Sequence, residues 1–403
     1  MTHGERIISG QLRVGDGERS AFGVGDIIAK IDAARRLAGM NRLLYLPSRD
    51  DALNKAVIGH CRKSGIEIYL WFKTLADNDV MAEPGELAVN AFGGTAGESG
   101  VWRQIFHAEE SFVFGCPQNE KYNNLLLSRC EQALEPFDGL FADSLGYPLP
   151  SLGLESVFTC FCPVCMEREP RLKEWRRNVL NLRESMECCS DDDIERWGTF
   201  RGHAEAFGLG EFYGSYRTGL LTALAGRYRE VADRAGKGFG LDVLSPALAF
   251  LAGHDYAELG KLADWLKPRI YCHTYGPSSI PLEYYCMAIG AQRWIKRASI
   301  AAIMDFISRS IGIELPKNLH RLTNTYLSRD DARRQIEEAL DSTTGPAHPG
   351  IECSIHPDYE TELDGAAVRG YLEAAAAAPG IVLCWNLLFI PDAFLRIVGE
   401  TTA

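Results

Sequence analysis

Phe137-Asp-Gly-Leu-Phe-Ala-Asp-Ser-Leu-Gly-Tyr-Pro148 is the stretch that most directly indicates the fold. Its centre, Gly139 to Asp143, is a short apolar run that ends in a carboxylate and is followed by turn-forming residues, as expected of a buried parallel strand. Segments of the same kind recur along the chain and alternate with helical patterns. This alternation predicts an α/β fold built around a parallel sheet.

Eight such segments follow one another in the sequence. The predicted strands are 6–13, 42–46, 66–73, 139–143, 238–243, 268–275, 350–356 and 380–385. Helical patterns follow at 25–38, 51–63, 120–134, about 170–235, about 282–341, 364–377 and 391–398. Eight β/α units in this order predict a closed (β/α)8 TIM barrel, with extended loops after strands three and four. A doubly wound open sheet is the alternative, but no Gly-rich nucleotide-binding motif lies at a strand–helix junction.

The composition restricts the class of protein. The 403 residues are 46% hydrophobic with a net charge of −12, so we expect one domain, residues 1–403, and no nucleic-acid partner. No apolar run approaches the roughly 20 residues of a membrane span, and the first residues have no apolar signal-peptide core. Twelve cysteines without such a signal favour a reducing compartment. We therefore predict a cytoplasmic protein with no membrane partner, and a homo-oligomer stays open.

The alternation of side chains along each strand predicts which of them point into the barrel. Asp143, Asp242 and Glu352 fall on the inward faces of strands four, five and seven, near their carboxyl ends. A buried carboxylate needs a partner or a function, and an ion-pair network with Arg269 and Lys73 is the purely structural alternative. Aromatic residues expected at the same rim favour a sugar-binding site. The predicted substrate-binding residues are Arg49, Trp71, Lys73, Tyr147, Asp242, Tyr271, His273, Tyr275, Trp385 and Asn386.

Four cysteines form a metal-binding pattern. Cys160, Cys162 and Cys165 lie in Phe-Thr-Cys-Phe-Cys-Pro-Val-Cys, and Cys116 lies upstream in Phe-Gly-Cys-Pro. Three thiolates close together and a fourth from another segment suit a tetrahedral structural zinc. An iron–sulfur cluster also takes four thiolates, but the proline and aromatic residues in the motif favour zinc. A zinc ion here would tie together a loop region of about residues 114–166.

This arrangement resembles that of the family 42 β-galactosidases. In that family a lone cysteine precedes a Cys-x-Cys-x-x-Cys motif, with an acid-bearing strand between them. The stretch from Phe137 to Pro148 also resembles a strand of barrel proteins described as glycosidase-like. The resemblance covers residues 114–166 and implies a (β/α)8-barrel glycoside hydrolase with a structural zinc. The chain is short for that family and has no room for its extra C-terminal domains.

The resemblance also implies catalytic roles. The acid/base of this clan ends strand four and the nucleophile lies on strand seven, which would make Asp143 the acid/base and Glu352 the nucleophile of a retaining two-carboxylate mechanism. The family has Asn-Glu where this chain has Ala142-Asp143, which leaves an inverting enzyme open. Two other functions stay open. One is a non-catalytic carbohydrate-binding barrel. The other is a metal-dependent sugar or polyol lyase or isomerase using His273, His356 and Asp242.

Overall fold

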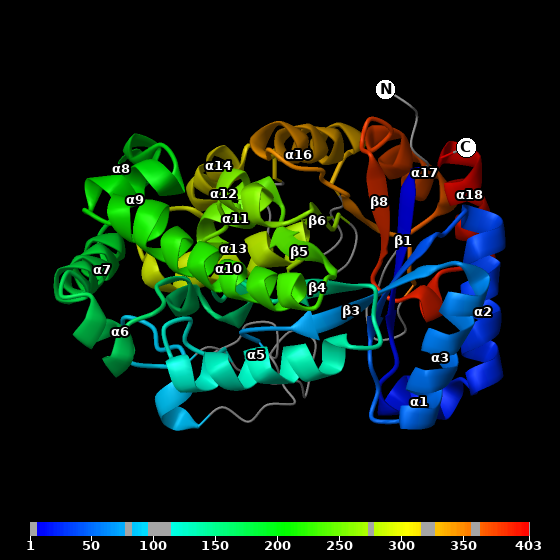
Figure 1. Ribbon diagram of the computed structural model, residues 1–403. Coiled ribbons are helices and arrows are strands. Elements are labelled where there is room, and N and C mark those ends of the chain that lie inside the picture. Colours follow the sequence, from blue (N-terminus) through cyan, green and yellow to red (C-terminus); the bar gives the residue numbers. More distant parts are fainter. Residues whose placement is uncertain are drawn as a thin grey trace.

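The barrel predicted from the sequence is present. The computed structural model describes residues 6–76, 83–95, 114–272, 278–315, 327–355 and 363–402. In these residues eight parallel strands close into a barrel in chain order (Figure 1). They are β1 (Ile7–Arg13), β2 (Arg42–Leu46), β3 (Glu67–Lys73), β4 (Gly139–Asp143), β5 (Gly238–Leu244), β6 (Trp265–Ile270), β7 (Gly350–Glu352) and β8 (Gly380–Cys384). The prediction of a (β/α)8 TIM barrel is confirmed.

Helices surround the barrel. They are α1 (Asp16–Ala21), α2 (Val24–Ala38), α3 (Asp51–Ser64), α5 (Glu120–Leu134), α6 (Pro163–Arg168), α7 (Leu172–Glu187), α8 (Asp191–Trp197), α9 (Phe200–Ala206), α10 (Thr218–Arg234), α11 (Pro246–Ala252), α12 (Tyr256–Leu262), α13 (Ile280–Trp294), α14 (Ile300–Ile311), α16 (Arg329–Ser342), α17 (Gly365–Ala374) and α18 (Asp392–Thr402). Short helical turns are η1 (Pro84–Glu86), η2 (Pro150–Leu152), η3 (Leu154–Val157), η4 (Phe212–Arg217) and η5 (Leu387–Phe389). Helix α18 packs against α2 and completes the ring, whereas α7, α8 and α9 form a lobe at the opposite end of the molecule (Figure 1). Among the described residues, no helix combines the length and the apolar run that a membrane crossing requires.

The sixth strand differs from the prediction of 268–275. It begins earlier, because Trp265 to Lys267 pair with Gly240 to Asp242 of β5, and it ends at Ile270. Residues 273–277 lie outside the described part of the chain, and so do His273 and Tyr275. The earlier start matters for function, because it adds the side chain of Lys267 to the barrel interior.

The seventh strand is shorter than the predicted 350–356. The backbone N–H groups of Cys353 and Ser354 both donate to the carbonyl oxygen of Cys384, at 2.8 and 3.1 Å. Two donors on one carbonyl break the regular ladder, so β7 ends at Glu352. His356 lies outside the described residues.

The barrel interior holds a small aromatic core. It comprises Leu44, Tyr69, Phe141, Trp265, Tyr271, Val382 and Cys384. The rings of Phe141 and Trp265 stack with centroids 5.3 Å apart. Glycine is required beside them, because a Cβ atom on Gly240 would lie 2.4 Å from the Trp265 ring. Small and large residues therefore alternate between neighbouring strands.

The outer core lies between the strands and the helices. Its strand residues include Leu70, Leu140, Leu241 and Ile351. Side chains next to these in sequence point the other way, into the barrel. This alternation directs the carboxylates of β4, β5 and β7 inward, as the sequence pattern predicts.

Candidate active site and cysteine cluster

A cavity of about 200 Å³ opens where the strands end at their carboxyl termini. Eight residues predicted from the sequence line it: Trp71, Lys73, Asp143, Tyr147, Asp242, Tyr271, Trp385 and Asn386. Arg49 is exposed and is not among the lining residues, and neither is Glu352. The cavity is on the face of the barrel where enzymes of this architecture bind their substrates.

Arg269 joins two carboxylates on the cavity wall. Its Nη2 atom donates to Asp143 Oδ1 and lies 2.9 Å from Asp242 Oδ2, while its Nη1 atom donates to Ser278 Oγ at 2.7 Å. The other oxygen of Asp143 accepts a hydrogen bond of 2.8 Å from Trp71 Nε1. Part of the ion-pair alternative considered from the sequence is therefore present in the structure.

Lys267 supplies the second cation of this network. Its fully buried Nζ atom contacts Tyr271 Oη at 2.6 Å, Gln11 Oε1 at 3.1 Å and Asp242 Oδ2 at 3.3 Å. The sequence pattern instead predicts Lys73 as the second cation. The actual start of β6 explains the difference, because Lys267 precedes the predicted strand.

The two aspartates have different protonation tendencies. Burial raises the pKa of Asp143, but the charges of Arg269 and Lys267 outweigh burial and hold the pKa at about 2. Burial raises the pKa of Asp242 above its ordinary value, although the same cations oppose it. Its Oδ1 atom has no hydrogen-bond partner within the described chain. Asp143 therefore ionises more readily than Asp242.

Glu352 lies behind the cavity wall. Its Oε1 atom accepts a hydrogen bond of 2.9 Å from Trp385 Nε1, and its Oε2 atom accepts one of 2.7 Å from the backbone of Cys272. The Trp385 ring packs on Tyr271 with centroids 4.8 Å apart, and both rings line the cavity. Glu352 therefore contacts the site through Trp385, and Tyr271, which had been expected to orient Glu352, binds Lys267 instead.

Glu283 is a cavity residue that the sequence analysis missed. This fully buried side chain on α13 accepts hydrogen bonds from the backbone and hydroxyl of Ser151 at 2.8 and 2.7 Å, and from the backbone of Ser278 at 2.8 Å. Burial raises its pKa to about 7 despite these donors. The only signal in the sequence is a lone acid in the apolar helix start Ile-Pro-Leu-Glu-Tyr-Tyr.

His254 connects the ends of two strands beside the cavity. Its Nδ1 atom accepts a hydrogen bond from the backbone of Leu244, and its Nε2 atom lies 2.7 Å from the carbonyl oxygen of Leu145. Burial lowers the pKa of His254 to about 4, so the ring is neutral at pH 7 and Nε2 carries its proton. It therefore contributes shape to the cavity and no charge.

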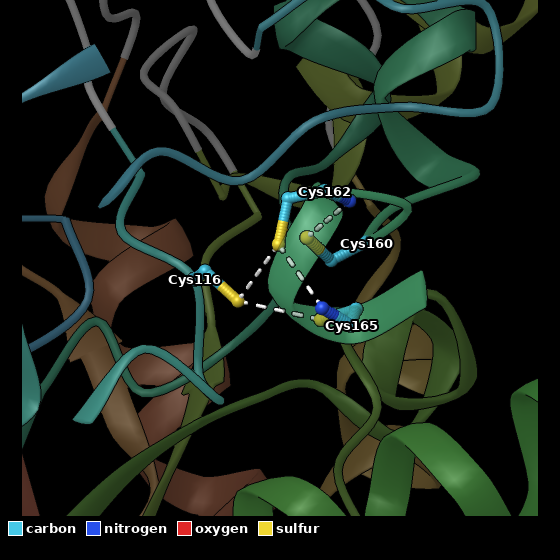
Figure 2. Close-up of side chains that lie close together, drawn as sticks. All are labelled: Cys116, Cys160, Cys162 and Cys165. Atoms are coloured by element: carbon cyan, nitrogen blue, oxygen red, sulfur yellow. Dashed lines mark hydrogen bonds between the residues drawn. The ribbon is translucent and has the colours of Figure 1, made fainter. Parts of the chain in front are cut away.

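The four predicted zinc ligands lie together in space. Figure 2 shows Cys116 from one loop facing Cys160 and Cys162, which lead into α6, and Cys165, which lies in the first turn of α6. All four are buried, and their sulfur atoms lie within 4.8 Å of one another. The sulfur of Cys116 is 3.4 Å from those of Cys162 and Cys165. Four sulfurs at about 2.3 Å from a central zinc would be about 3.8 Å apart, so the cluster fits a tetrahedral ion.

The backbone around the cluster favours thiolates. Backbone N–H groups donate to three sulfurs: Gln118 to Cys116, Cys162 to Cys160, and Cys165 to Cys162, at 3.4 to 3.5 Å. Without a metal, contacts with the other thiols, Cys116 first, lower the pKa of Cys162, whereas burial raises that of Cys160 and contact with Cys116 raises that of Cys165. In the described residues this is the only group of three or more His, Cys, Asp or Glu side chains that could hold a metal ion.

Comparisons with known proteins give no family. No family model matches the chain, and no curated protein matches it. Solved structures match it with TM-scores below 0.5. A chitinase from Chromobacterium violaceum is 10% identical, with 99% of both chains covered and a TM-score of 0.46. A Group IV chitinase from Ostrinia furnacalis, in complex with allosamidin, is 11% identical, with 98% of both chains covered and a TM-score of 0.48.

An α-galactosidase from Thermus thermophilus is 10% identical, with 99% of this chain and 62% of that chain covered and a TM-score of 0.44. Likenesses at these values carry no argument about activity, and the barrel topology rests on the strand order itself. They give no link to the family 42 β-galactosidases, so that part of the sequence prediction stays an expectation.

Proposed function

We propose that this chain is a glycoside hydrolase-like enzyme that binds a small carbohydrate in the cavity and uses two carboxyl groups. One observation carries the proposal. The same cavity holds Asp143, whose pKa is about 2, and Glu283, whose pKa is about 7. Cleavage of a glycosidic bond requires one ionised and one protonated carboxyl group, and environments that drive two pKa values apart supply such a pair.

The roles differ from those implied by the sequence resemblance. The charge of Arg269 lowers the pKa of Asp143 and keeps its carboxyl group ionised. In this proposal Asp143 therefore acts as nucleophile or base and not as the acid. Glu283 is the proton donor, because a pKa near 7 allows it to lose and regain a proton at neutral pH. Glu352 is assigned a positioning role, since it holds the Trp385 ring against the cavity.

Aromatic side chains support a sugar as the substrate. Trp71, Tyr147, Tyr271 and Trp385 line the same cavity as the carboxylates. Ligand pockets typically combine apolar aromatic walls with a few polar groups in fixed positions, and this combination suits a sugar ring.

Sugar binding without cleavage is the second candidate. It is favoured by the bonding of Asp143, whose two oxygens already accept from Arg269 and Trp71. A carboxylate with both oxygens engaged must give up a partner before it can attack a substrate. The metal-dependent lyase or isomerase is not proposed, because His273 and His356 lie outside the described residues.

The test is hydrolysis of a panel of aryl glycosides by the parent and by single variants. We expect the parent to cleave at least one glycoside and Asp143→Asn to lower kcat by at least about 100-fold. Glu283→Gln should impair substrates with poor leaving groups most, because good leaving groups need little proton assistance. Glu258→Gln, which removes an exposed carboxylate on α12, is the control and should retain full activity.

The alternative outcomes are distinct. Full activity in Asp143→Asn would contradict the two-carboxylate mechanism. A parent that cleaves nothing but is protected against thermal unfolding by a sugar would establish the binding function. A parent that does neither would refute both candidates. For an active enzyme, the anomeric form of the first product decides between retention and inversion.

The cysteine cluster is proposed to hold one structural zinc. The four buried thiols leave no open ligand position, and they come from the loops after β3 and β4. A closed site of this kind would hold the two loops together and take no part in the chemistry. Metal analysis should give one zinc per chain, and iron or no metal would contradict the assignment.

A further inference from the structure

The π-helical turn η4 buries a charged residue without an anionic partner. Arg217 is fully buried, and its Nη2 atom donates to the carbonyl oxygen of Leu251 at 2.8 Å. Its Nε and Nη1 atoms have no hydrogen-bond partner, and no carboxylate pairs with it, within the residues that the structure describes. A buried cation left without a counter-charge costs several kcal/mol, on the order of a whole domain's stability.

Aromatic rings enclose this cation. The guanidinium carbon lies 4.1 Å from the ring centroid of Tyr147, 4.8 Å from that of Tyr213 and 5.6 Å from that of Phe212. Such contacts attract a cation but do not neutralise it. Burial lowers the pKa of Arg217, and the groups that oppose this are Tyr213, Tyr147 and the Cys160 thiol.

A metal-loaded cysteine cluster would carry negative charge close to this turn. Four thiolates around a divalent ion would carry a net charge of −2. Phe161, which lies between Cys160 and Cys162, stacks on Phe212 of η4 with ring centroids 5.2 Å apart. The neighbouring Tyr216 also faces the cluster, because the hydroxyl of Tyr216 accepts a hydrogen bond from Gln118, two residues after Cys116. The turn η4 therefore lies against the cluster segment through Phe212 and Tyr216, and Arg217 follows directly in the chain.

We propose that Arg217 is the counter-charge of a metal–tetrathiolate centre and connects that centre to the cavity wall through the ring of Tyr147. The inference rests on the proposed zinc site. It explains why a fully buried arginine has no carboxylate partner in the described chain. Arg217 would also extend the influence of the metal from its two loops to the cavity, because Arg217 contacts the ring of Tyr147 and Tyr147 lines the cavity.

The test compares zinc retention in R217M and R217K with the parent. Transfer of zinc to a chromogenic chelator is followed for each purified protein. R217M should lose zinc affinity by about tenfold or more, as is typical when a partner outside the ligand shell is removed. R217K, which keeps the charge, should stay within about threefold of the parent. R201M removes another arginine that stacks on an aromatic ring, that of Phe250, and should bind zinc like the parent.

Charge compensation provides the second measurement. Cys160→His converts the site to three cysteines and one histidine. The net charge of the metal-loaded centre then changes from −2 to −1, so a neighbouring cation stabilises it less. R217M should therefore destabilise the Cys160→His protein less than the parent in thermal unfolding with zinc. If R217M alone is insoluble, recovery of soluble protein in the double variant supports the proposal. Equal effects of R217M in both backgrounds would overturn it.

Failure of the zinc site can be told from failure of the inference. A parent that binds no zinc refutes the metal site itself. A parent that binds one zinc with the same affinity in R217M refutes only the role of Arg217.

Discussion

At the scale of single residues, Arg269 controls the ionisation of the carboxyl groups that line the cavity. Its guanidinium contacts both Asp143 and Asp242, and its charge is the main reason that the pKa of Asp143 falls against the effect of burial. In the described part of the chain, the hydrogen-bond donors to Glu283 are uncharged, and burial raises its pKa. Two carboxyl groups of one cavity thus acquire opposite tendencies from their neighbours.

A stability prediction follows for Glu283. Its pKa rises from an ordinary value of about 4.3 to about 7 in the folded chain, so the folded state binds the proton more tightly. This stabilisation is complete below about pH 4 and is lost as the pH rises through 7. Glu283→Gln does not titrate, so it should gain up to about 3 kcal/mol relative to the parent between about pH 5 and pH 8.

Denaturant unfolding of both proteins across this pH range measures the effect. Glu258→Gln, which changes an exposed carboxylate, should show no such trend. The measured quantity is the difference in free energy of unfolding between Glu283→Gln and the parent. If this difference shifts in favour of the parent as the pH rises, Glu283 is ionised in the folded protein throughout.

At the scale of elements, glycines in the strands make room for the aromatic interior. A Cβ atom on Gly240 of β5 would lie 2.4 Å from the Trp265 ring, which stacks on Phe141 inside the barrel. The interior is closed on all sides by neighbouring strands, so Trp265 has little space to move. The interior residues of β5 and β6 therefore constrain each other.

Gly240→Ala should destabilise the barrel by about 1–3 kcal/mol, because it overpacks this interior. Gly226→Ala is the matched control, since Gly226 lies on α10 and a Cβ there would meet nothing within 4 Å. Alanine is the better helix former, so the control should be neutral or stabilising by up to about 1 kcal/mol. Equal unfolding midpoints in denaturant for the two variants would contradict the packing argument.

At the scale of the whole molecule, the cysteine cluster connects distant parts of the chain. Cys116 follows the long connection after β3, whereas the other three cysteines precede the helices that form the lobe of α7, α8 and α9 (Figure 1). A metal ion at this point would hold the lobe side of the barrel to the β3 connection. Its binding free energy would count toward the stability of the whole fold.

Removal of the metal should therefore lower the unfolding temperature of the entire protein by about 5 °C or more. Calorimetry with and without a chelator measures the change. Cys188→Ser alters an exposed cysteine outside the cluster and should keep both the metal and the chelator effect. Cys116→Ser should resemble the chelated parent, and an unchanged unfolding temperature in that variant would contradict a structural role.

The barrel, the inward carboxylates and the cysteine cluster could all be predicted from the sequence. Each depends on local information, because strand alternation sets the face of Asp143 and Asp242, and the spacing of Cys160, Cys162 and Cys165 brings their thiols together. The sequence pattern predicts Pro268 as the first residue of the sixth strand, whereas β6 begins at Trp265. Lys267 was therefore left out of the predicted interior.

Only the tertiary structure decided how the carboxyl groups differ. The ion pairs of Arg269 join residues of β4, β5 and β6, and the hydrogen bonds of Glu283 come from two loops that are far apart in sequence. Glu352 follows the predicted alternation, yet Trp385 stands between it and the cavity. A pKa depends on burial and on charges a few ångströms away, and those distances exist only once the chain has closed into a barrel.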